Sequence, residues 1–471
     1  MKKGYILINV LVFSVIAIIV TTSLTNWAGV MLKSSQRLSY REQAFQIAEA
    51  GIDYYRWHLA HDSTDYKDGT ATTTTGPFIH DFVDKDGVII GQFALTITPP
   101  PVGSSLIKIK SKGTVLIDPD VSRTVQVTLA IPSFAKYAVV ASDIMRFGEG
   151  TEIFGPIHSN DGIRFDGLAH NQVTSSKSQY VDPDSGTSQR FGVYTTVSPA
   201  DPNSPAAVPD RPDVFMAGRQ FPVAVVDFAG IINDLSNMKA DAISGGRYFA
   251  ASGAQGYSIV LKTNDTFDIY KVTSLRSPPH GCGNSLGQTG WGTWSINNRT
   301  LINNYPLPVN GIIFVEDHVW VEGQINSARV TIAAGRFPDS LATRKDIIVN
   351  NDLLYTNYDG QDTVALVAQG NVTIGFYSDN YLKIDAALIA QNARVGRFYY
   401  SFAACGTNAK RSDITLYGMI GTNKRYGFAY TDSTGYSTRN IIYDGNLLYS
   451  PPPSFPLTSN QYSILSWEEV K

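Results

Sequence analysis

The chain opens with a long apolar segment. Between Lys3 and Lys33 no charged side chain occurs, and from residue 5 to residue 20 only Asn9 and Ser14 interrupt the apolar run. About 20 predominantly apolar residues can span a bilayer as a helix, and lysines in front of such a segment stay cytoplasmic by the positive-inside rule. We therefore expect one membrane-spanning helix, with the body of the chain outside the cytoplasm.

Two simpler interpretations compete with this one. A secretory signal peptide has a short apolar core followed by a small-residue cleavage site, and no A-x-A pattern follows this segment. A plain membrane anchor is the second alternative, and it stays open on this evidence.

The apolar pattern becomes one-sided over residues 34–61. Apolar side chains recur there at three- and four-residue spacing, at Phe45, Ala48, Ile52, Tyr55 and Leu59. This is the periodicity of an amphipathic helix. No proline occurs before Pro77, so nothing forces a break, and we expect a single helix over 5–61. At about 1.5 Å per residue it is roughly 80 Å long, apolar all round first and one-sided later.

Alternating apolar and polar residues follow. After a polar, threonine-rich loop over 62–76, four segments alternate with period two, as half-buried antiparallel strands do: residues 87–90, 92–98, 106–111 and 124–131. Asp86-Gly87 is a hairpin-turn dipeptide. We expect a small antiparallel β head region over 62–135, against which the amphipathic part of the helix lies.

Residues 136–450 have a different sequence pattern, in which short apolar strands are separated by Gly, Asn and Asp. Four strands open at intervals of 17, 17 and 18 residues, at Val330, Ile347, Val364 and Leu382, and a small-x-Ile-x-x-Asn pattern recurs at 155–160, 387–392 and 418–423. Such a repeat fits one coil of a β-solenoid, and Asn tolerates the left-handed conformation of coil corners. We expect a β-solenoid-like (β-helix) domain; a large irregular β-sandwich is the alternative.

Several stretches depart from the coil pattern. Residues 171–222 and 244–305, rich in Pro and Asp or in Gly and Trp, indicate insertions at about 171–305. Between them, residues 228–243 predict a short helix with one apolar face, formed by Phe228, Ile231, Ile232 and Leu235. Residues 451–471 are assigned to a C-terminal tail. The expected fold class is therefore α+β, mostly β.

The charge composition argues against one class of partner. Lys and Arg number 38 against 41 Asp and Glu, for a net charge of -3, and no basic run is visible. A nucleic-acid binder usually shows a basic excess, so we expect no nucleic acid partner.

The two cysteines, Cys282 and Cys405, lie 123 residues apart, which excludes a CxxC motif. One disulfide and two unpaired thiols are both compatible with an exported chain.

No catalytic or cofactor motif is present. The seven histidines form no HExxH spacing, and no GxSxG, Walker A or strand-linked GxGxxG sequence occurs, so we expect no catalytic residues, no metal and no cofactor. Asp81, Asp84 and Asp86 lack the calcium-loop spacing and predict a solvated turn. A β-helix is also a fold of carbohydrate-cleaving enzymes, and such enzymes need carboxylates that converge on one face. The candidates are Glu316, Asp317, His318, Asp379, Lys383 and Asp385, with Trp291, Trp294, Tyr399 and Tyr400 as a sugar- or protein-binding face.

The first sixty residues resemble type IV pilins. Lys2-Lys3-Gly4 before Tyr5 and the apolar run looks like a class III (prepilin) signal, and Ala48-Glu49-Ala50-Gly51 resembles a segment of PilX-type minor pilins. The resemblance implies a leader, residues 1–4, that a prepilin peptidase cuts between Gly4 and Tyr5, with methylation of the new N-terminus. It also implies membrane lipid around the helix first, and then assembly with other pilins or minor pilins on an inner-membrane platform.

Asn9 departs from the major pilins, which carry glutamate at the fifth mature position. In the family, that carboxylate neutralises the N-terminal amine of a neighbouring subunit, because a buried unpaired charge is costly. Tip-located GspK-type pseudopilins also lack it. The resemblance therefore implies a minor pilin or pseudopilin at or near a filament tip, priming assembly and mediating adhesion. The alternatives are that Asn9 is merely a tolerated polar residue, and that the chain is a membrane-anchored β-helix surface protein that binds or cleaves carbohydrate.

Overall fold

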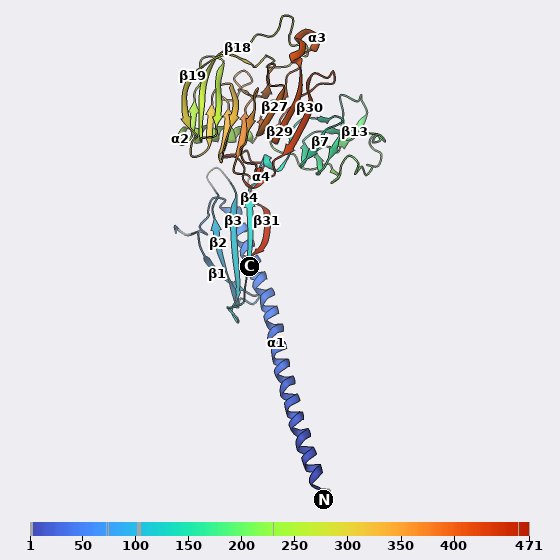
Figure 1. The fold of residues 1–471 in the computed structure, drawn as a ribbon, viewed down its shortest axis with the longest axis vertical. Helices are drawn as coiled ribbons and strands as arrows, with labels where there is room; N and C mark the ends of the chain where they lie inside the picture. The colour runs from blue at the N-terminus through green and yellow to red at the C-terminus, as the bar shows by residue number, and fades with distance from the viewer. Residues whose placement is uncertain are drawn as a thin grey trace. The chain divides into compact units, whose positions relative to one another are not determined.

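The computed structural model describes residues 3–71, 73, 75–100, 105–228, 230–459 and 461–470, with the side chains of residues 3–5 and 231–233 outside the description. The chain divides into two compact units (Figure 1). The helix-and-sheet unit comprises Met1–Pro100, Leu106–Ala130 and Gln461–Lys471. The solenoid unit comprises Pro101–Ser105 and Ile131–Asn460. Of the predicted leader, residues 1 and 2 lie outside the described residues.

One helix dominates the first unit. α1, Lys3–His61, runs without a break, as the absence of proline predicts. Its first half projects beyond the sheet (Figure 1), whereas the second half packs on it and buries Ala48, Ile52, Tyr55 and Leu59 of the predicted apolar stripe, with Phe45 partly buried. The amphipathic half is thus stabilised by burial against the sheet rather than by helix propensity alone.

The sheet of this unit is an antiparallel meander with one addition. Its order is β1 (Phe78–Val83), β2 (Ile89–Thr98), β3 (Ile107–Val115), β4 (Ser122–Ala130) and β31 (Ser463–Val470). The Asp86-Gly87 turn joins β1 to β2, and Asp84 accepts bonds from the backbone of Asp86 and Val88. β31 lies beside β4 (Figure 1), with Trp467 opposite Val127. The residues assigned to a tail therefore include a strand, which covers the edge that β4 would otherwise expose.

Small residues let α1 approach the sheet closely. Gly51 belongs to the Ala-Glu-Ala-Gly segment, and a Cβ there would come within 2.3 Å of the Ser111 hydroxyl and 2.8 Å of the Phe93 ring. A Cβ here would force Ser111 and Phe93 to shift, because ordinary carbon contacts need about 3.5–4.0 Å. The motif that carries the pilin resemblance thus has a packing role here.

The solenoid unit is a stack of mostly parallel strands, with antiparallel pairing of β12 with β13 and of β18 with both β17 and β19. Residues 139–220 supply one run, and residues 247–443 supply the other. The first run contains β5 (Val139–Ala141), β6 (Met145–Phe147), β7 (Glu152–Phe154), β8 (Ile157–Ser159), β9 (Ile163–Phe165), β10 (Leu168–Ala169), β11 (Val173–Ser175), β12 (Gln179–Val181), β13 (Gln189–Phe191), β14 (Val193–Tyr194) and β15 (Arg219–Gln220). The second contains β16 (Arg247–Phe249), β17 (Gly256–Lys262), β18 (Thr266–Leu275), β19 (Ile296–Pro306), β20 (Ile312–Val315), β21 (Val319–Gln324), β22 (Arg329–Ala334), β23 (Ile347–Ile348), β24 (Leu353–Leu354), β25 (Thr363–Ala368), β26 (Val372–Ile374), β27 (Tyr381–Ala390), β28 (Val395–Arg397), β29 (Lys410–Thr422) and β30 (Gly435–Tyr443).

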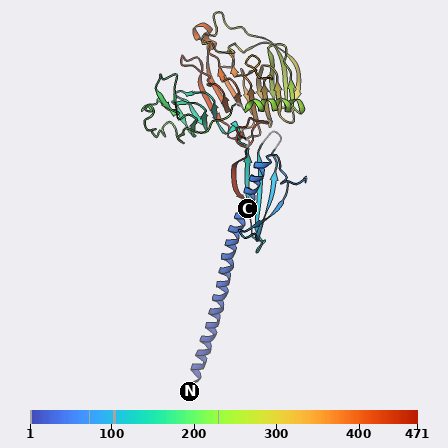
Figure 2. The ribbon, with the colours of Figure 1, turned by 180° about the vertical axis from the view of Figure 1, so that it is seen from behind.

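The two runs join in the middle of the stack. Ile420 of β29 pairs with Val139 of β5, so the last long coil lies against the first. The chain winds outward from β5 to β15, crosses back through α2 (Ile231–Ser244), and winds from β16 to meet β5 again. Both views show β27 to β30 between the two ends (Figures 1 and 2). Parts of the predicted insertion at 171–305 are therefore coils: β11 pairs in parallel with β8, and β16 with β20.

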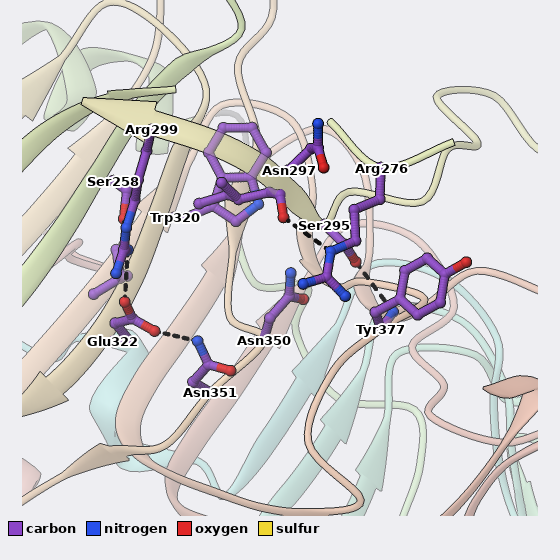
Figure 3. Close-up of a pocket in the computed structure, with 12 residues that line it drawn as sticks. Ser258, Arg276, Ser295, Asn297, Arg299, Trp320, Glu322, Asn350, Asn351 and Tyr377 are labelled. Atoms are coloured by element: carbon purple, nitrogen blue, oxygen red, sulfur yellow. Dashed lines mark hydrogen bonds and ion pairs between the residues drawn. The ribbon is translucent and has the colours of Figure 1, made fainter. Parts of the chain in front are cut away.

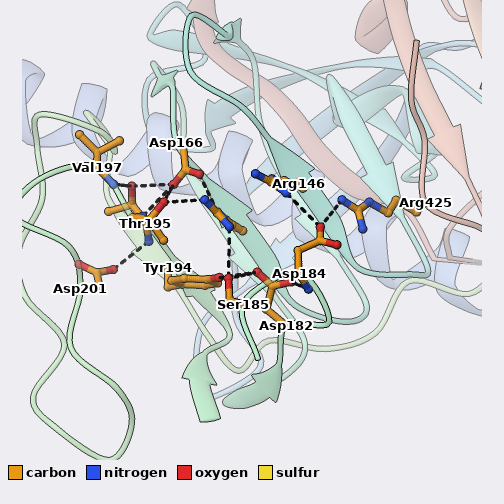
Figure 4. Close-up of polar contacts among 12 residues, drawn as sticks. Arg146, Asp166, Asp182, Asp184, Ser185, Tyr194, Thr195, Val197, Asp201 and Arg425 are labelled. Atoms are coloured by element: carbon orange, nitrogen blue, oxygen red, sulfur yellow. Dashed lines mark hydrogen bonds and ion pairs between the residues drawn. The ribbon is translucent and has the colours of Figure 1, made fainter. Parts of the chain in front are cut away.

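Ion pairs join the two runs where they meet. Asp184 accepts bonds from Arg146 of the first run at 3.3 Å and from Arg425 of the second at 2.7 Å (Figure 4). Asp182 in the same loop is bonded by Ser185 at 3.0 Å and by the Tyr194 hydroxyl. The Pro/Asp-rich loop is thus held by these polar contacts as well as by the buried aromatic cluster of Tyr180, Phe191 and Tyr194.

The coils are longer than the 17-residue spacing predicts. Val330 pairs with Val364, two intervals further on, and Ile347 instead pairs with Val372 on another face. The interval therefore links strands on different faces of the solenoid, not equivalent strands of successive coils. Coil length also varies, since Ala365 pairs with Ala387.

One face of the solenoid is buried on both sides. In β25 every residue is buried, with Leu366 in the interior core and Val367 in a second apolar cluster outside it. Leu235 and Met238 of α2 belong to this outer cluster, so the predicted short helix covers the face; the side chains of Ile231 and Ile232 lie outside the described residues. Burial on both sides explains the continuous apolar runs of these strands. Short helices complete the unit: η1 (Phe134–Lys136), α3 (Phe402–Cys405), η2 (Gly406–Ala409) and α4 (Asn446–Tyr449).

Candidate functional site

The most exposed apolar surface of the described residues is the first half of α1. Phe13 is 71% exposed and Val15 47%, and the apolar side chains from Ile6 to Leu32 are exposed on every side of the helix. A contiguous apolar surface of this size marks a membrane or protein interface. Within the described chain, α1 is the one helix long and apolar enough to cross a bilayer, judged by length and composition.

Hydroxyl groups on this surface are satisfied by the helix itself. Ser14 donates to the Val10 carbonyl at 2.8 Å, Thr21 to the Ala17 carbonyl at 2.8 Å, and Thr25 to the Thr21 carbonyl at 3.0 Å. An unpaired hydroxyl costs several kcal/mol in a hydrocarbon environment, where no water replaces the bond. These hydroxyl groups are therefore compatible with lipid or with a packed helical bundle.

Asn9 is the polar exception near the start of the helix. Its side chain is exposed, and it makes no hydrogen bond to any residue that the structure describes. Gly4 and Tyr5, the predicted processing site, belong to the helical backbone of α1, while their side chains lie outside the description. Asn9 follows Tyr5 by about one helical turn. Its amide is free to bond to a group on another molecule.

Basic residues mark the end of the apolar surface. Lys33, Arg37 and Arg41 follow one another at four-residue spacing, which places them on one face of α1. They line an open hollow together with Val30 and Asp120. Cationic side chains at the end of an apolar helix suit the membrane–water boundary.

The two cysteines are brought together in the solenoid unit. Cys282 and Cys405 form a disulfide, with their Cα atoms 4.6 Å apart. It connects the long loop between β18 and β19 to α3 and lies in a small cluster with Phe376 and Tyr400. The spacing of the two cysteines in the sequence could not predict this pairing, because their proximity depends on how the coils stack.

The first group of candidate catalytic residues is held by structural contacts. Glu316 accepts bonds from Lys239 and from the Tyr248 hydroxyl; burial opposes its ionisation, but these bonds outweigh burial and lower its pKa. Asp317 accepts bonds from the backbone and hydroxyl of Ser252 at 2.9 and 2.7 Å. Burial and the neighbouring Lys345 lower the pKa of His318 to about 4. Each side chain thus serves the packing between coils.

The second group is arranged similarly. Asp385 accepts bonds from the Tyr355 amide at 2.9 Å and from the Tyr358 hydroxyl at 2.7 Å, and burial raises its pKa. Burial also raises the pKa of Asp379. Among the described residues, no group of three His, Cys, Asp or Glu side chains is placed to hold a metal ion.

Two of the four candidate aromatics, Trp291 and Trp294, lie in the loop between β18 and β19, and Tyr399 and Tyr400 contact that loop. The Trp291 indole donates to the Tyr399 carbonyl at 3.0 Å, and the Tyr400 hydroxyl donates to the Gly292 carbonyl at 2.7 Å. The Trp294 indole donates to the Gly290 carbonyl at 2.8 Å. These side chains hold the loop in place rather than forming an open aromatic platform.

Comparisons with known proteins are sparse. No protein-family model matches the chain, and no curated protein matches it. The crystal structure of the competence-associated pilin ComZ from Thermus thermophilus is similar to it with 14% identity, covering 92% of this chain and 97% of that chain, at a TM-score of 0.28. At that score the two structures do not superpose closely, so the fold description rests on this chain's own elements. Those elements are a long N-terminal helix, apolar and exposed in its first half, and a small antiparallel sheet on which its second half packs.

Proposed function

We propose that the chain is a minor pilin or pseudopilin, a structural subunit at or near the tip of a type IV pilus-like filament. The observation that carries the proposal is the division of α1. Its second half is buried against the sheet, whereas its first half exposes apolar side chains all round. Such a surface needs lipid before assembly and the helices of neighbouring subunits afterwards.

Processing follows from this role. The leader, residues 1–4, is removed by a prepilin peptidase, and Tyr5 becomes a methylated N-terminus. The other partners are further pilins or minor pilins and the inner-membrane assembly platform, with no nucleic acid. The chain is first a single-pass protein of the cytoplasmic membrane, its body extracytoplasmic, and then part of a surface filament.

Two features support the tip rather than the shaft. Asn9 lacks the carboxylate that would neutralise the amine of a subunit above it, and a subunit with nothing above it needs no such charge. The solenoid unit, Pro101–Ser105 and Ile131–Asn460, is bulky for a subunit repeated at every step of a thin fibre. Both features favour a single copy at the tip of the filament, which is the first subunit to be assembled.

Electron microscopy of labelled filaments tests the position. A small peptide tag inserted after Gly253, where a Cβ would meet open space, carries the gold label. We expect label at one end of each filament, and filaments in a strain carrying the tagged chain as its single copy to be as numerous as those of the untagged strain. Regular label along the shaft would contradict a tip position.

The alternative is a membrane-anchored β-helix protein that acts outside any filament. Its Gly4–Tyr5 bond would stay intact, because a plain anchor needs no processing. A Gly4→Arg variant separates the two: it abolishes incorporation of a pilin but leaves the surface exposure of a plain anchor unchanged.

A further inference from the structure

A polar cleft lies in the solenoid unit, and none of its lining residues belongs to α1. The β18–β19 hairpin and the loop that joins its strands form one wall. β21 and the segments at Asn350–Asn351 and Tyr377 form the other (Figure 3). The volume is about 300 Å³, at the lower end of small-ligand sites, so it accepts a short segment of a larger molecule.

One side of the cleft is built as a fixed polar lattice. Arg299 donates to Glu322 and to the buried Ser258 hydroxyl, both at 2.7 Å, and its guanidinium lies 4.5 Å from the centre of the Tyr270 ring. Asn351 donates to the second oxygen of Glu322. Arg299 and Glu322 neutralise each other, which leaves this side with amide groups and no net charge.

The other side carries an unneutralised cation. Arg276 donates through Nε to the Ile296 carbonyl at 3.2 Å, and its guanidinium lies over the Tyr377 ring. Its two terminal nitrogens make no bond to a described residue. In Figure 3 they project into the space between Asn350 and Tyr377. A guanidinium held in this way presents a forked pair of donors, which match a carboxylate in two parallel bonds.

The floor and rim complete a binding surface of mixed character. Trp320 and Ile296 supply apolar surface at the base. Asn297 at the rim is exposed and donates to the Ser274 hydroxyl at 3.2 Å, and its carbonyl oxygen makes no bond to a described residue. Amide side chains both donate and accept, which is what a ligand with adjacent hydroxyl groups requires.

The wall that carries Arg276 is immobilised from behind. Gln288 of the same loop accepts a bond from the Tyr399 amide at 2.7 Å and donates to the Tyr430 hydroxyl at 3.0 Å. The disulfide between Cys282 and Cys405 ties the loop to α3. A rigid wall loses little conformational entropy on binding, so this cleft is organised before a ligand arrives.

We propose that this cleft binds acidic oligosaccharides, with a sugar carboxylate on Arg276 and sugar hydroxyls on Asn297 and Asn351. A plain anion would use the guanidinium but not the amides, and a neutral sugar would leave the cation unpaired. The proposal supplies a ligand class for the adhesion that the pilin resemblance implies, yet it rests on the cleft alone. Binding is measured on the purified chain, so its failure would leave the filament role untouched.

The test uses the full chain in detergent micelles and isothermal titration calorimetry. The probes are oligogalacturonate, oligoalginate and a hyaluronan hexasaccharide, with methyl-esterified oligogalacturonate as the uncharged match and a glutamate hexapeptide as the acid without sugar. We expect at least one acidic oligosaccharide to bind, and its affinity to fall at least about tenfold, or about 1.4 kcal/mol, in Arg276→Gln. Asn297→Ala should weaken binding by a smaller factor.

Lys410→Gln is the matched control, because Lys410 is also exposed and its ammonium lies 4.8 Å from the centre of the Phe402 ring. It should bind as the unaltered chain does, and all three variants should keep its unfolding temperature. Three results would each overturn the proposal. These are no binding of any acidic oligosaccharide up to about 1 mM, equal binding of the methyl ester or the hexapeptide, and an Arg276→Gln variant that binds as tightly as Lys410→Gln.

Discussion

Gly113 of β3 lies directly beneath Ala44 of α1. A Cβ on Gly113 would come within 2.1 Å of the Ala44 carbonyl oxygen and 2.6 Å of the Ala48 amide nitrogen. Both partners are backbone atoms, so no side-chain rotation can relieve the contact. The closest approach of helix and sheet therefore depends on an absent side chain in the strand and on small side chains in the helix.

Gly113→Ala should destabilise the helix-and-sheet unit. The added methyl group forces α1 away from β3, and overpacking of this kind costs about 1–3 kcal/mol. Gly29→Ala is the control, because a Cβ there meets nothing within 4 Å and alanine favours the helix. Thermal unfolding in detergent, monitored by protease cleavage within the sheet, should show a lower unfolding temperature for Gly113→Ala but not for Gly29→Ala. Equal transitions for both variants would refute close packing at this point.

The disulfide predicts a pattern among cysteine variants. Cys282→Ser, Cys405→Ser and the double variant should lose the same stability, because each breaks the same bond; the chain-entropy value for this loop is about 4–5 kcal/mol. Non-reducing peptide mapping of protein from its native compartment should show one cross-linked peptide. Alkylation of both thiols without reduction, or additive losses in the double variant, would exclude the pair.

His318 predicts a pH-dependent contribution to stability. Its pKa in the folded chain is lowered to about 4 by burial and by Lys345, against about 6.5 when unfolded, and its Nδ1 accepts a bond from the Asp346 amide at 3.1 Å. The folded chain favours the neutral ring. The contribution is therefore complete above pH 6.5 and is lost as the pH falls toward 4, by about 3 kcal/mol.

Asp346 opposes this trend, because burial raises the pKa of its carboxyl to about 6, and that effect favours the folded chain as the pH falls. The measurement is therefore the difference in unfolding free energy between the unaltered chain and His318→Gln. We expect the advantage of the histidine to shrink between pH 7 and pH 4. An advantage that stays constant or grows over this range would contradict a buried, neutral ring.

Local patterns predicted the parts of the fold that local sequence determines. The periodicity of Ala48, Ile52 and Tyr55 predicted the packed face of α1, and alternation predicted β2, β3 and β4, because each pattern lies within one element. β31 was missed because its partner β4 is distant in sequence, and Glu468-Glu469 hides the alternation. In the structure Glu468 accepts a bond from Gln126 at 2.6 Å, and Glu469 pairs with Arg123.

The solenoid was predicted as a fold class but not in its register. Val330 and Val364 do stack, yet coil length varies, and β5, the first strand of the solenoid unit, lies in the middle of the stack. The cleft lay beyond sequence reasoning for the same reason. Arg276, Glu322 and Asn351 come from three separate segments that only the stacking of unequal coils brings together.

Asn9→Glu tests the role of the missing carboxylate. In a subunit with nothing above it, an added carboxylate has no amine to pair with, and burying it unpaired costs several kcal/mol. We expect filament number per cell, counted by electron microscopy, to stay the same or fall, with Ser14→Ala as a neutral control in the same helix. More filaments, or copies moved into the shaft, would show that Asn9 is a weakened version of the usual contact.

The central claim is that this chain is a processed filament subunit, and mass spectrometry of its mature N-terminus tests it most directly. The account predicts that the protein recovered from sheared surface filaments begins at Tyr5, carries one methyl group, and lacks residues 1–4. A Gly4→Arg variant should keep the leader and stay in the membrane fraction. An intact Met1 in protein recovered from filaments, or cleavage anywhere after the apolar segment, would contradict it.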